Sequence, residues 1–235
     1  MKAVILAGGF GKRLRPLTDD RPKPLIELNG VPILLVQIEW LKKSGIDEII
    51  LCIGYRKEAI MKRIGDGSSF GIKVRYAIEE EPLGTGGALK NAESLIKDNT
   101  SFLVLNGDII TDIDPSLLFQ KIASGAWSSI SIVPLRSPFG IVEIENELVK
   151  GFVEKPVLPD YSINAGIYCF SNEIFNRLPK NGSIETETFP ALAEESKLVA
   201  VSYPRSAWLS IDSHKDIEKA SEMFSDDIKM IKSRS

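Results

Sequence analysis

Short apolar segments alternate with amphipathic segments through the first half of the chain, and this alternation limits the fold more than any other feature. Most of these apolar segments contain almost no polar residue, which is typical of strands buried on both faces of a sheet. Between them, apolar residues recur at helical spacing, as at Leu34, Ile38 and Leu41, and Gly45 follows as a helix C-cap. The expected strands are 3–6, 48–53, 73–77 and 102–105, and the expected helices are 33–43, 57–64 and 86–96. This pattern predicts an α/β fold whose mixed sheet is mainly parallel and is flanked by helices.

The second half of the chain has a different character. Strand-like segments at 129–134, 141–144, 148–153 and 164–170 are joined by short connections, which predicts antiparallel strands added to the parallel core. Helices are expected at 187–195 and 215–223. We see no linker composition and no internal repeat, so residues 1–225 are expected to form a single domain. Residues 226–235 are expected to form a polar tail that frays.

Charge and cysteine content exclude several classes of protein. The formal net charge is −3 and there is no long basic run, which argues against a nucleic-acid partner. No apolar run approaches the ~18–20 residues needed to span a membrane, and the first one is too short for a signal peptide. Cys52 and Cys169 lie in separate apolar segments without metal-ligand spacing, so we expect two reduced, buried thiols. These features predict a cytoplasmic protein with no membrane partner.

A glycine-rich loop follows the first expected strand directly, with the sequence LAGGFGKRLRPLT from Leu6 to Thr18. Glycines without a Cβ allow close approach of a ligand, and their N–H groups can form a nest for an anion. Lys12, Arg13 and Arg15 add positive charge, and the segment Pro22-Lys23-Pro24 holds another lysine between two restricting prolines. Glycines after a strand are often only a tight turn, but these cations favour a polyphosphate site.

Two common phosphate-binding loops do not match this segment. If Gly11-Lys12 were the end of a Walker motif, its first glycine would fall on Leu6 and its serine or threonine on Arg13. In the dinucleotide motif GxGxxG, the third glycine would fall on Leu14. The loop is therefore a phosphate site of another kind.

The loop and the RPKPLI segment after it resemble the signature of the sugar-1-phosphate nucleotidyltransferases. Further segments follow in the family's order over about residues 1–220: EEEPLGTGG from Glu79, NGD from Asn106, EKP from Glu154, NAG from Asn164 and WLSID from Trp208. The resemblance implies a Rossmann-like nucleotidyltransferase domain. Some members carry a carboxy-terminal β-helix, for which this chain has no room, so acetyltransferase activity and assembly through that helix are not expected.

The resemblance also implies which residues bind the two substrates. The nucleotide-binding set is Leu6, Ala7, Gly8, Gly9, Gly11, Lys12, Arg13, Lys23, Glu79, Gly84, Thr85 and Asp108, with Arg13, Lys23 and Asp108 as the catalytic residues. The sugar-phosphate-binding set is Gly140, Glu154, Lys155, Asn164 and Trp208, with Lys155 on the phosphate. Without the resemblance, Glu154 and Lys155 would be read as an ordinary solvated charge pair.

Two aspartates are the candidate metal ligands. Asp108 follows an apolar strand and Asp212 lies in a turn before an expected helix. Carboxylate oxygens suit Mg²⁺, which takes one or two of them together with substrate phosphates. From the residues alone, Asp108 could equally be a turn residue and Asp212 a helix N-cap; the resemblance implies that both bind Mg²⁺. The chain's one histidine, His214, is expected on the surface, which leaves charge neutralisation and positioning as the means of catalysis.

The expected reaction joins an NTP to a sugar 1-phosphate and releases pyrophosphate. EEEPLGTGG and the later SIETETFP, from Ser183, resemble the mannose-1-phosphate and heptose-1-phosphate guanylyltransferases, which implies GTP and mannose 1-phosphate as substrates. Glu79 or Glu80 would accept the two adjacent donors of guanine. Two alternatives stay open: a glucose-1-phosphate thymidylyl- or uridylyltransferase, and a non-catalytic regulatory subunit that binds a sugar nucleotide. Whether the chain forms a homo-oligomer also stays open.

Overall fold

The computed structural model describes residues 1–233. The strands are β1 (Lys2–Leu6), β2 (Glu27–Leu28), β3 (Val31–Pro32), β4 (Glu48–Ile53), β5 (Lys73–Ile78), β6 (Ser101–Asn106), β7 (Ile109–Thr111), β8 (Ser128–Arg136), β9 (Ile141–Glu145), β10 (Leu148–Val153), β11 (Val157–Ser171), β12 (Leu198–Ser202) and β13 (Trp208–Ser210). The α-helices are α1 (Ile33–Lys43), α2 (Lys57–Ile64), α3 (Gly84–Asn91), α4 (Glu93–Ile96), α5 (Ser116–Ala123), α6 (Phe189–Glu194), α7 (His214–Met223) and α8 (Ser225–Lys232). Short 3₁₀ helices η1 (Lys12–Leu14), η2 (Lys23–Leu25), η3 (Ser68–Phe70) and η4 (Asn172–Asn176) and a π-helical turn η5 (Ile184–Thr188) complete the fold.

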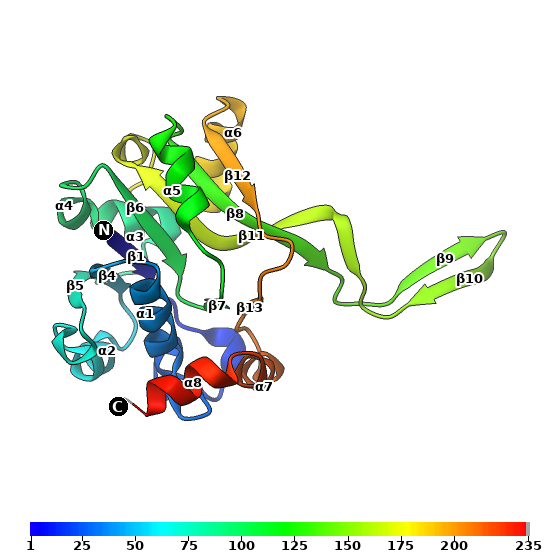
Figure 1. Ribbon diagram of the computed structural model, residues 1–235, viewed down its shortest axis with the longest axis horizontal. Coiled ribbons are helices and arrows are strands. Elements are labelled where there is room, and N and C mark those ends of the chain that lie inside the picture. The colour runs from blue at the N-terminus through cyan, green and yellow to red at the C-terminus, as the bar shows by residue number, and fades with distance from the viewer. Residues whose placement is uncertain (234–235) are drawn as a thin grey trace.

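A seven-stranded sheet forms the centre of the molecule, in the order β12-β8-β11-β6-β1-β4-β5 (Figure 1). β1 is parallel to β4 on one side and to β6 on the other, and Leu6 at its end pairs with both Cys52 and Asn106. The chain runs from β1 outward through β4 to β5 and then returns to the other side of β1 at β6. The strand order therefore reverses between β1 and β6, and ligands bind at such a reversal, beyond the carboxyl ends of the strands.

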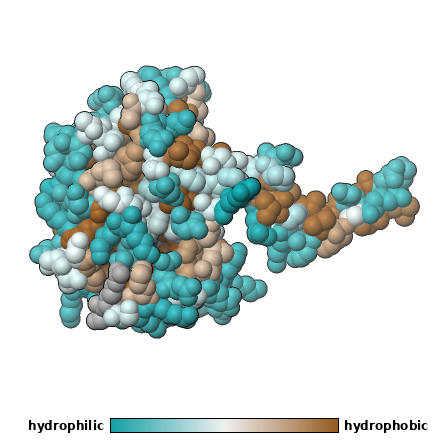
Figure 2. All heavy atoms as spheres, in the orientation of Figure 1, coloured by the Kyte–Doolittle hydropathy of each residue, from teal (hydrophilic) through white to brown (hydrophobic). Residues whose placement is uncertain are grey.

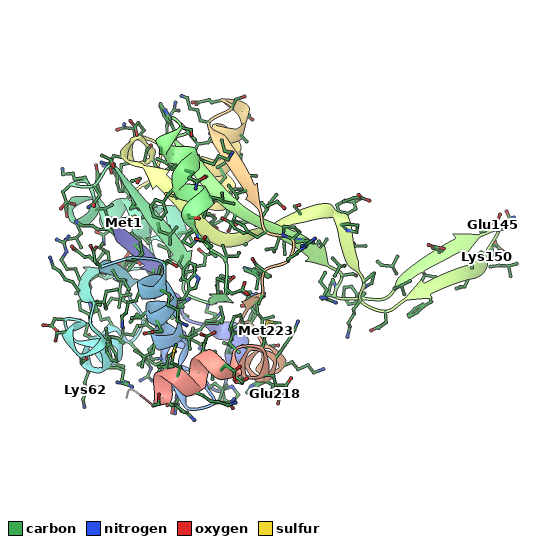
Figure 3. All side chains as sticks on the ribbon, viewed as in Figure 1. Met1, Lys62, Glu145, Lys150, Glu218 and Met223 are labelled. Carbon is green, nitrogen blue, oxygen red and sulfur yellow. The ribbon has the colours of Figure 1, made fainter. Side chains whose placement is uncertain are left out.

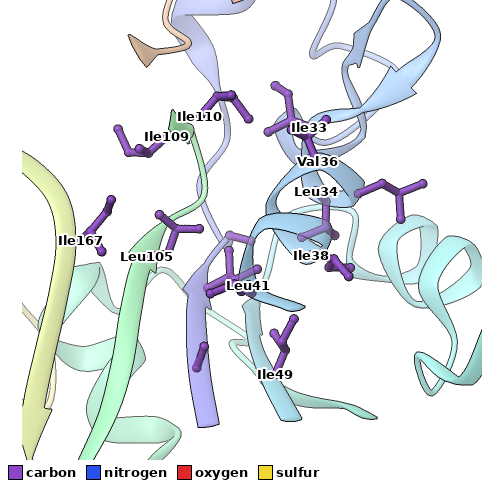
Figure 4. Close-up of a cluster of buried hydrophobic side chains, with 14 of the residues drawn as sticks. Ile33, Leu34, Val36, Ile38, Leu41, Ile49, Leu105, Ile109, Ile110 and Ile167 are labelled. Atoms are coloured by element: carbon purple, nitrogen blue, oxygen red, sulfur yellow. The ribbon is translucent and has the colours of Figure 1, made fainter. Parts of the chain in front are cut away.

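Helices cover both faces of this sheet, which explains why its central strands β1, β4 and β6 are almost wholly apolar. Ile5 and Ile49 point to one face and belong to the core that α1, α2, α5, α7 and α8 cover; part of this core is drawn in Figure 4. Val4 and Ile50 point to the other face, against α3, α4 and α6. Neighbouring residues on a strand face opposite sides of the sheet, so a strand packed on both sides has no polar position to spare. The expected α/β fold is confirmed.

The antiparallel addition predicted for the second half is correct in part. β11 is antiparallel to both β6 and β8, so β8 and β11 extend the sheet as expected, and β12 adds in parallel to β8. β9 and β10 were expected to join the sheet as well, but they pair only with each other. They form a hairpin that projects far from the body of the molecule, which we call the arm (Figure 1).

The arm turns at Asn146 and Glu147, which both have positive φ, the backbone that a tight two-residue hairpin turn requires. Glu145 and Lys150 mark its far end in Figure 3. Register places the pairs Ile144–Val149 and Val142–Phe152 on one face of the two-stranded ribbon. All four side chains are exposed, and apolar residues are correspondingly visible along the arm in Figure 2. Alternating apolar residues thus predict a strand correctly without showing whether a sheet covers it.

The C-terminal segment differs from the expected fraying tail. α8 covers Ser225–Lys232, and Ile228 and Ile231 are buried in the core beside α1. These isoleucines are three residues apart on one helix face, while the charged residues between them lie on the other face and gave the segment its polar composition. The expectation of a polar tail from residue 226 is therefore wrong for 226–232, and its last two residues, 234 and 235, lie outside the described part of the chain.

Most of the other helices follow the prediction, but α5 was not among the expected helices. α1 and α2 have the predicted bounds. The helix expected over 86–96 begins two residues earlier, at Gly84, and is interrupted at Ala92. Across residues 1–233, every helix is too short or too polar to cross a membrane.

Candidate active site

The glycine loop lies at the point where the strand order reverses. The loop leaves β1 at Leu6, and its first residue, Ala7, donates its N–H to the carbonyl of Cys52 on β4 (2.8 Å). From the other side, Gly107 after β6 donates its N–H to the Leu6 carbonyl (2.9 Å). A Cβ at Gly107 would lie 2.5 Å from that carbonyl oxygen, so this close approach requires glycine. The loop and the segment after β6 therefore meet at one site.

A cavity of about 410 Å³ opens at this site. Every residue of the expected nucleotide-binding set lines it: Leu6, Ala7, Gly8, Gly9, Gly11, Lys12, Arg13, Lys23, Glu79, Gly84, Thr85 and Asp108. Four separate segments of sequence contribute, namely the loop after β1, the start of η2, the segment from Glu79 after β5 into α3, and the turn after β6. Cavities of this size are typical of small-molecule sites.

Gly11 brings the loop against the lysine of the PKP segment. Its φ of 62° is left-handed, a backbone that glycine adopts without strain. A Cβ there would lie 2.9 Å from Thr18 Cγ2 and 3.2 Å from Lys23 Cβ. The Thr18 hydroxyl donates to the Gly11 carbonyl (3.0 Å), which holds the turn. Lys23 therefore reaches the site from directly behind the loop.

Lys23 joins the two predicted metal ligands. Its Nζ is 3.0 Å from Asp108 Oδ2 and 3.0 Å from Asp212 Oδ1. Arg13 Nη1 lies 3.0 Å from the other oxygen of Asp212. The backbone also links the two aspartate segments, because Ile211 donates its N–H to the Asp108 carbonyl (2.9 Å). The structure thus brings together residues that are more than a hundred positions apart in sequence.

The cations around Asp212 keep it ionised. Burial would raise the pKa of this carboxyl, but the ammonium of Lys23 and the guanidinium of Arg13 outweigh burial and hold the pKa below its ordinary value. The Ser210 hydroxyl also donates to Asp212 Oδ2 (3.1 Å). The alternative from sequence, that Asp212 is the N-cap of the next helix, is wrong, because Ser213 provides the side-chain cap of α7.

Few other side chains near Asp108 and Asp212 could add ligands to a metal ion. Within residues 1–233 there is no cluster of three or more His, Cys, Asp or Glu side chains that could hold a metal alone. Asp108 and Asp212 nevertheless offer two hard oxygen donors to one point, the position of Lys23 Nζ. Such a pair suits a cation that takes most of its ligands from water and substrate phosphates, as Mg²⁺ does.

Glu79 lies at another part of the cavity wall, beside Gly8. Its side chain is buried, and Leu83 donates its N–H to Oε2 (3.2 Å). Oε1 is buried without a hydrogen-bond partner and would lie only 2.7 Å from a Cβ at Gly8. Burial raises the pKa of this carboxyl, and the Leu83 N–H opposes burial only in part. A buried acceptor on a cavity wall that the protein leaves unpaired is expected to accept from a bound ligand or from water.

Glu80, the other candidate from sequence, has a different environment. Its side chain is 82% exposed, pairs with Lys57 at 2.8 Å and does not line the cavity. Glu79 directly follows β5, whereas the chain bends at Glu80.

Three members of the sugar-phosphate set meet at the base of the arm and not at the cavity. Gly140 precedes β9, and Glu154 and Lys155 follow β10. A Cβ at Gly140 would lie 3.0 Å from Glu154 Oε2. Lys155 pairs with Glu154 at 3.5 Å, and both side chains are mostly exposed. The structure therefore brings these three residues together and leaves them free to meet a ligand from solvent.

The remaining two members lie nearer the centre of the sheet. Asn164 donates to the Tyr168 hydroxyl (2.8 Å), and Trp208 Nε1 donates to the Ala165 carbonyl (2.7 Å). Trp208 begins β13, the strand that leads to Asp212. Both contacts are with β11, and β13 pairs with β7, the strand that follows Asp108.

Sequence reasoning missed some residues of the site. Asn106 lines the cavity, and its Oδ1 is buried without a partner; the Asn-Gly-Asp motif had marked it, but only its aspartate was assigned. Glu185, on η5, accepts from the Thr85 hydroxyl (2.5 Å) and so positions a residue of the cavity wall. Glu185 lies in the SIETETFP segment, but nothing local shows this contact, because Thr85 is a hundred residues away in sequence.

Curated proteins similar to this chain are named mannose-1-phosphate guanylyltransferases. The mannose-1-phosphate guanylyltransferase catalytic subunit beta of Dictyostelium discoideum is 40% identical over 92% of this chain, and that of Danio rerio is 41% identical over 92%. The chain spans 62% of the length of each of these relatives.

Solved structures share the fold over nearly the whole chain. HddC from Yersinia pseudotuberculosis, solved in complex with GMP-PN, is 32% identical, with a TM-score of 0.75 over 95% of this chain and 99% of its own. A Bacillus anthracis chain solved with sucrose is 22% identical, with a TM-score of 0.76 over 95% of this chain and 94% of its own, and that likeness bears on the fold alone. Residues 2–227 match the family described as Nucleotidyl transferase, and the chain belongs to that family.

Proposed function

We propose that this chain catalyses the reaction of GTP with mannose 1-phosphate to give GDP-mannose and pyrophosphate. The observation that carries the proposal is the cavity between β1 and β6, where the glycine loop meets a buried glutamate and the cluster of Lys23, Arg13 and two aspartates. Relatives about 40% identical are named mannose-1-phosphate guanylyltransferases, which favours this pair of substrates.

The reaction is a single in-line displacement. A phosphate oxygen of the sugar 1-phosphate attacks the α-phosphorus of GTP, a new P–O bond forms, and the bond from that phosphorus to the β-phosphate bridging oxygen breaks. The electron pair of that bond leaves with pyrophosphate. The attacking oxygen is already anionic, so no base is required, in agreement with the exposed position of His214, the only histidine, at the start of α7.

Repulsion between two phosphates is the main barrier to this reaction, and the chain's own cations oppose it. The N–H groups of the glycine loop and the cations Lys23 and Arg13 bind and orient the triphosphate. Charges held in place before the reaction stabilise the transition state without rearrangement, and this is often the largest catalytic contribution. Lys155, at the base of the arm, binds the phosphate of the sugar substrate.

Asp108 and Asp212 would hold a divalent cation, which we propose is Mg²⁺. Its chemistry there would be to neutralise phosphate charge and to orient the phosphates. The two carboxylates converge on one point and fit this role.

Glu79 is the proposed reader of the base. Guanine presents a ring N–H and an adjacent amino group, and an ionised carboxylate can accept from both. Uracil and thymine present one N–H between two carbonyl oxygens, so one carboxylate oxygen would face an acceptor. The unpaired Oε1 on the cavity wall supports this role.

A cytoplasmic location is part of the proposal and agrees with two buried, unpaired cysteines.

One experiment tests the whole proposal. GTP, ATP, UTP, dTTP and CTP are each combined with mannose 1-phosphate and with glucose 1-phosphate, and pyrophosphate release is measured with Mg²⁺ and with EDTA. We expect the highest kcat/KM for GTP with mannose 1-phosphate, and none in EDTA. A preference for dTTP or UTP with glucose 1-phosphate would replace the proposal with the thymidylyl- or uridylyltransferase alternative. Binding of GDP-mannose without pyrophosphate release from any pair would indicate the regulatory subunit.

A further inference from the structure

Lys23 occupies the point on which the proposed metal ligands converge. Its ammonium is 3.0 Å from Asp108 Oδ2 and 3.0 Å from Asp212 Oδ1. We propose that the Lys23 ammonium occupies the metal position and so prevents a free divalent ion from binding to this carboxylate pair. The ammonium leaves the two carboxylates only when the phosphates of a nucleotide arrive together with the ion. The inference rests on the proposed function, because that function supplies the nucleotide.

Charge balance is the first argument. Asp108 and Asp212 carry two negative charges, and Lys23 and Arg13 carry two positive charges within 3.0 Å of them. A free divalent ion entering this neutral cluster would add two uncompensated positive charges. A metal–triphosphate complex instead brings more negative charge than positive, so it leaves the cluster without an excess of positive charge.

Burial makes this balance effective. The Lys23 side chain is 14% exposed, and those of Asp108 and Asp212 are 25% and 28% exposed. Water and salt screen charges poorly at such positions, so repulsion between the ammonium and a second cation is strong. Arg13, at 73% exposed, reaches Asp212 from solvent and is less able to keep a metal out.

The backbone of Lys23 is fixed while its side chain can move. Lys23 begins the short helix η2 between Pro22 and Pro24, whose ring structures fix φ, and Ile26 donates its N–H to the Lys23 carbonyl (3.0 Å). Four methylene groups carry the ammonium, which can change partners by rotation about these bonds. A change of partner therefore needs no movement of the main chain.

The phosphate position lies within reach of that rotation. Lys23 lines the cavity, and a Cβ on Gly11 of the phosphate loop would lie only 3.2 Å from Lys23 Cβ. The ammonium can therefore turn from the carboxylates to the phosphates when these arrive, which frees the carboxylates at the same time. Metal and nucleotide should consequently bind with positive coupling, and Lys23 is the residue that produces it.

Mn²⁺ binding to the full chain without nucleotide tests the proposal, with free Mn²⁺ measured by electron paramagnetic resonance. Lys23→Met keeps most of the length of the side chain, one atom short, and removes its charge. We expect this variant to bind one Mn²⁺ at least tenfold more tightly than the unmodified protein does. Lys23→Met combined with Asp108→Asn should lose that gain. Lys12→Met is the matched control, because Lys12 lines the same cavity but contacts the ring of Phe10, and it should bind Mn²⁺ as the unmodified protein does.

Two results would overturn the proposal. One is unmodified protein that binds Mn²⁺ without nucleotide as tightly as Lys23→Met does; the other is an equal gain in Lys12→Met. Thermal unfolding shows whether each variant is folded. If Lys23→Met is not, Lys23→Gln takes its place, because an amide keeps a donor to the carboxylates without the charge.

This titration is independent of turnover. It uses neither a sugar phosphate nor a particular NTP, so a protein that prefers another base or sugar would leave the expected result unchanged. Conversely, the pyrophosphate assay can succeed with GTP and mannose 1-phosphate even if the Mn²⁺ titration fails. The two proposals can therefore fail separately.

Discussion

Gly8 and Glu79 fit together so closely that a Cβ on Gly8 would lie 2.7 Å from Glu79 Oε1 and 3.2 Å from its carboxyl carbon. Glu79 is buried, and its other oxygen is held by the N–H of Leu83, so it has little freedom to move away. The position of Glu79, the proposed reader of the base, thus depends on the absence of a side chain at Gly8 of the glycine loop.

The first prediction follows from this contact. Gly8→Ala should lower the free energy of unfolding by about 1–3 kcal/mol, because the added Cβ overlaps the buried Glu79 carboxylate that Leu83 holds in place. Gly9→Ala is the matched control: a Cβ there meets nothing within 4 Å, and the change should be within about 0.5 kcal/mol of zero or slightly stabilising. Urea denaturation measures both variants. Equal effects at the two positions would contradict the close fit.

The second prediction concerns pH and Glu79. Burial raises its pKa in the folded protein, so folding favours the protonated form. The stability from this group is therefore fully present below its unfolded pKa and is lost as pH rises through the raised folded pKa. Glu79→Gln, which cannot ionise, should unfold at higher urea concentration than the unmodified protein at about pH 8, and the difference should shrink towards about pH 4. A difference that is independent of pH would show that Glu79 is not the titrating group.

The third prediction concerns Lys155. Lys155→Ala should raise KM for the sugar 1-phosphate by about 10- to 150-fold, the value of a lost charge-assisted hydrogen bond of about 1.5–3 kcal/mol, and leave KM for the nucleotide nearly unchanged. Lys150→Ala is the matched control, since Lys150 is a half-exposed lysine of the arm that pairs with Glu145 far from the body. Initial-rate kinetics with each substrate varied in turn decide the matter. If both variants raise the sugar-phosphate KM alike, the arm's total charge and not Lys155 is responsible.

The fourth prediction concerns Arg13. Its guanidinium contacts Asp212, and it lines the cavity, so Arg13→Ala should lower kcat and kcat/KM together by about 10²-fold, as expected for a contact made in the transition state. Arg15→Ala is the control from the same loop, because Arg15 pairs with Asp19 at 3.2 Å and does not line the cavity. Steady-state rates of pyrophosphate release compare the two. A loss of similar size in Arg15→Ala would show that the loop's conformation is being disturbed.

The sequence was sufficient for those parts of the structure that depend on local pattern. The sequence predicts the central strands because nearly every residue in 3–6, 49–53 and 102–105 is apolar, and it predicts the loop because glycines and cations stand together. The sequence does not predict helix α8, because two buried residues, Ile228 and Ile231, in a charged segment give a weak helical signal.

Contacts between residues that are distant in sequence could not be predicted from the sequence. The ion pairs of Lys23 with Asp108 and Asp212 depend on three segments that meet only in the folded chain. The family resemblance implies that the two aspartates bind metal, but it does not imply that a lysine lies between them. Likewise, the alternation in β9 and β10 predicts two strands but contains nothing about whether they lie on the sheet or project as the arm.

The last prediction concerns the base. The unmodified protein should use GTP with a higher kcat/KM than UTP or dTTP, because an ionised Glu79 accepts from two guanine donors but faces a carbonyl oxygen in the other bases. A buried mismatch of about 1–3 kcal/mol corresponds to about 5- to 150-fold in kcat/KM. Glu79→Gln should narrow or invert this preference while the KM for sugar 1-phosphate stays nearly constant, since an amide can donate as well as accept. Glu80→Gln is the matched control, because Glu80 is 82% exposed, pairs with Lys57 and does not line the cavity. If Glu80→Gln changes the base preference and Glu79→Gln does not, Glu80 is the reader and must turn inward when the nucleotide binds.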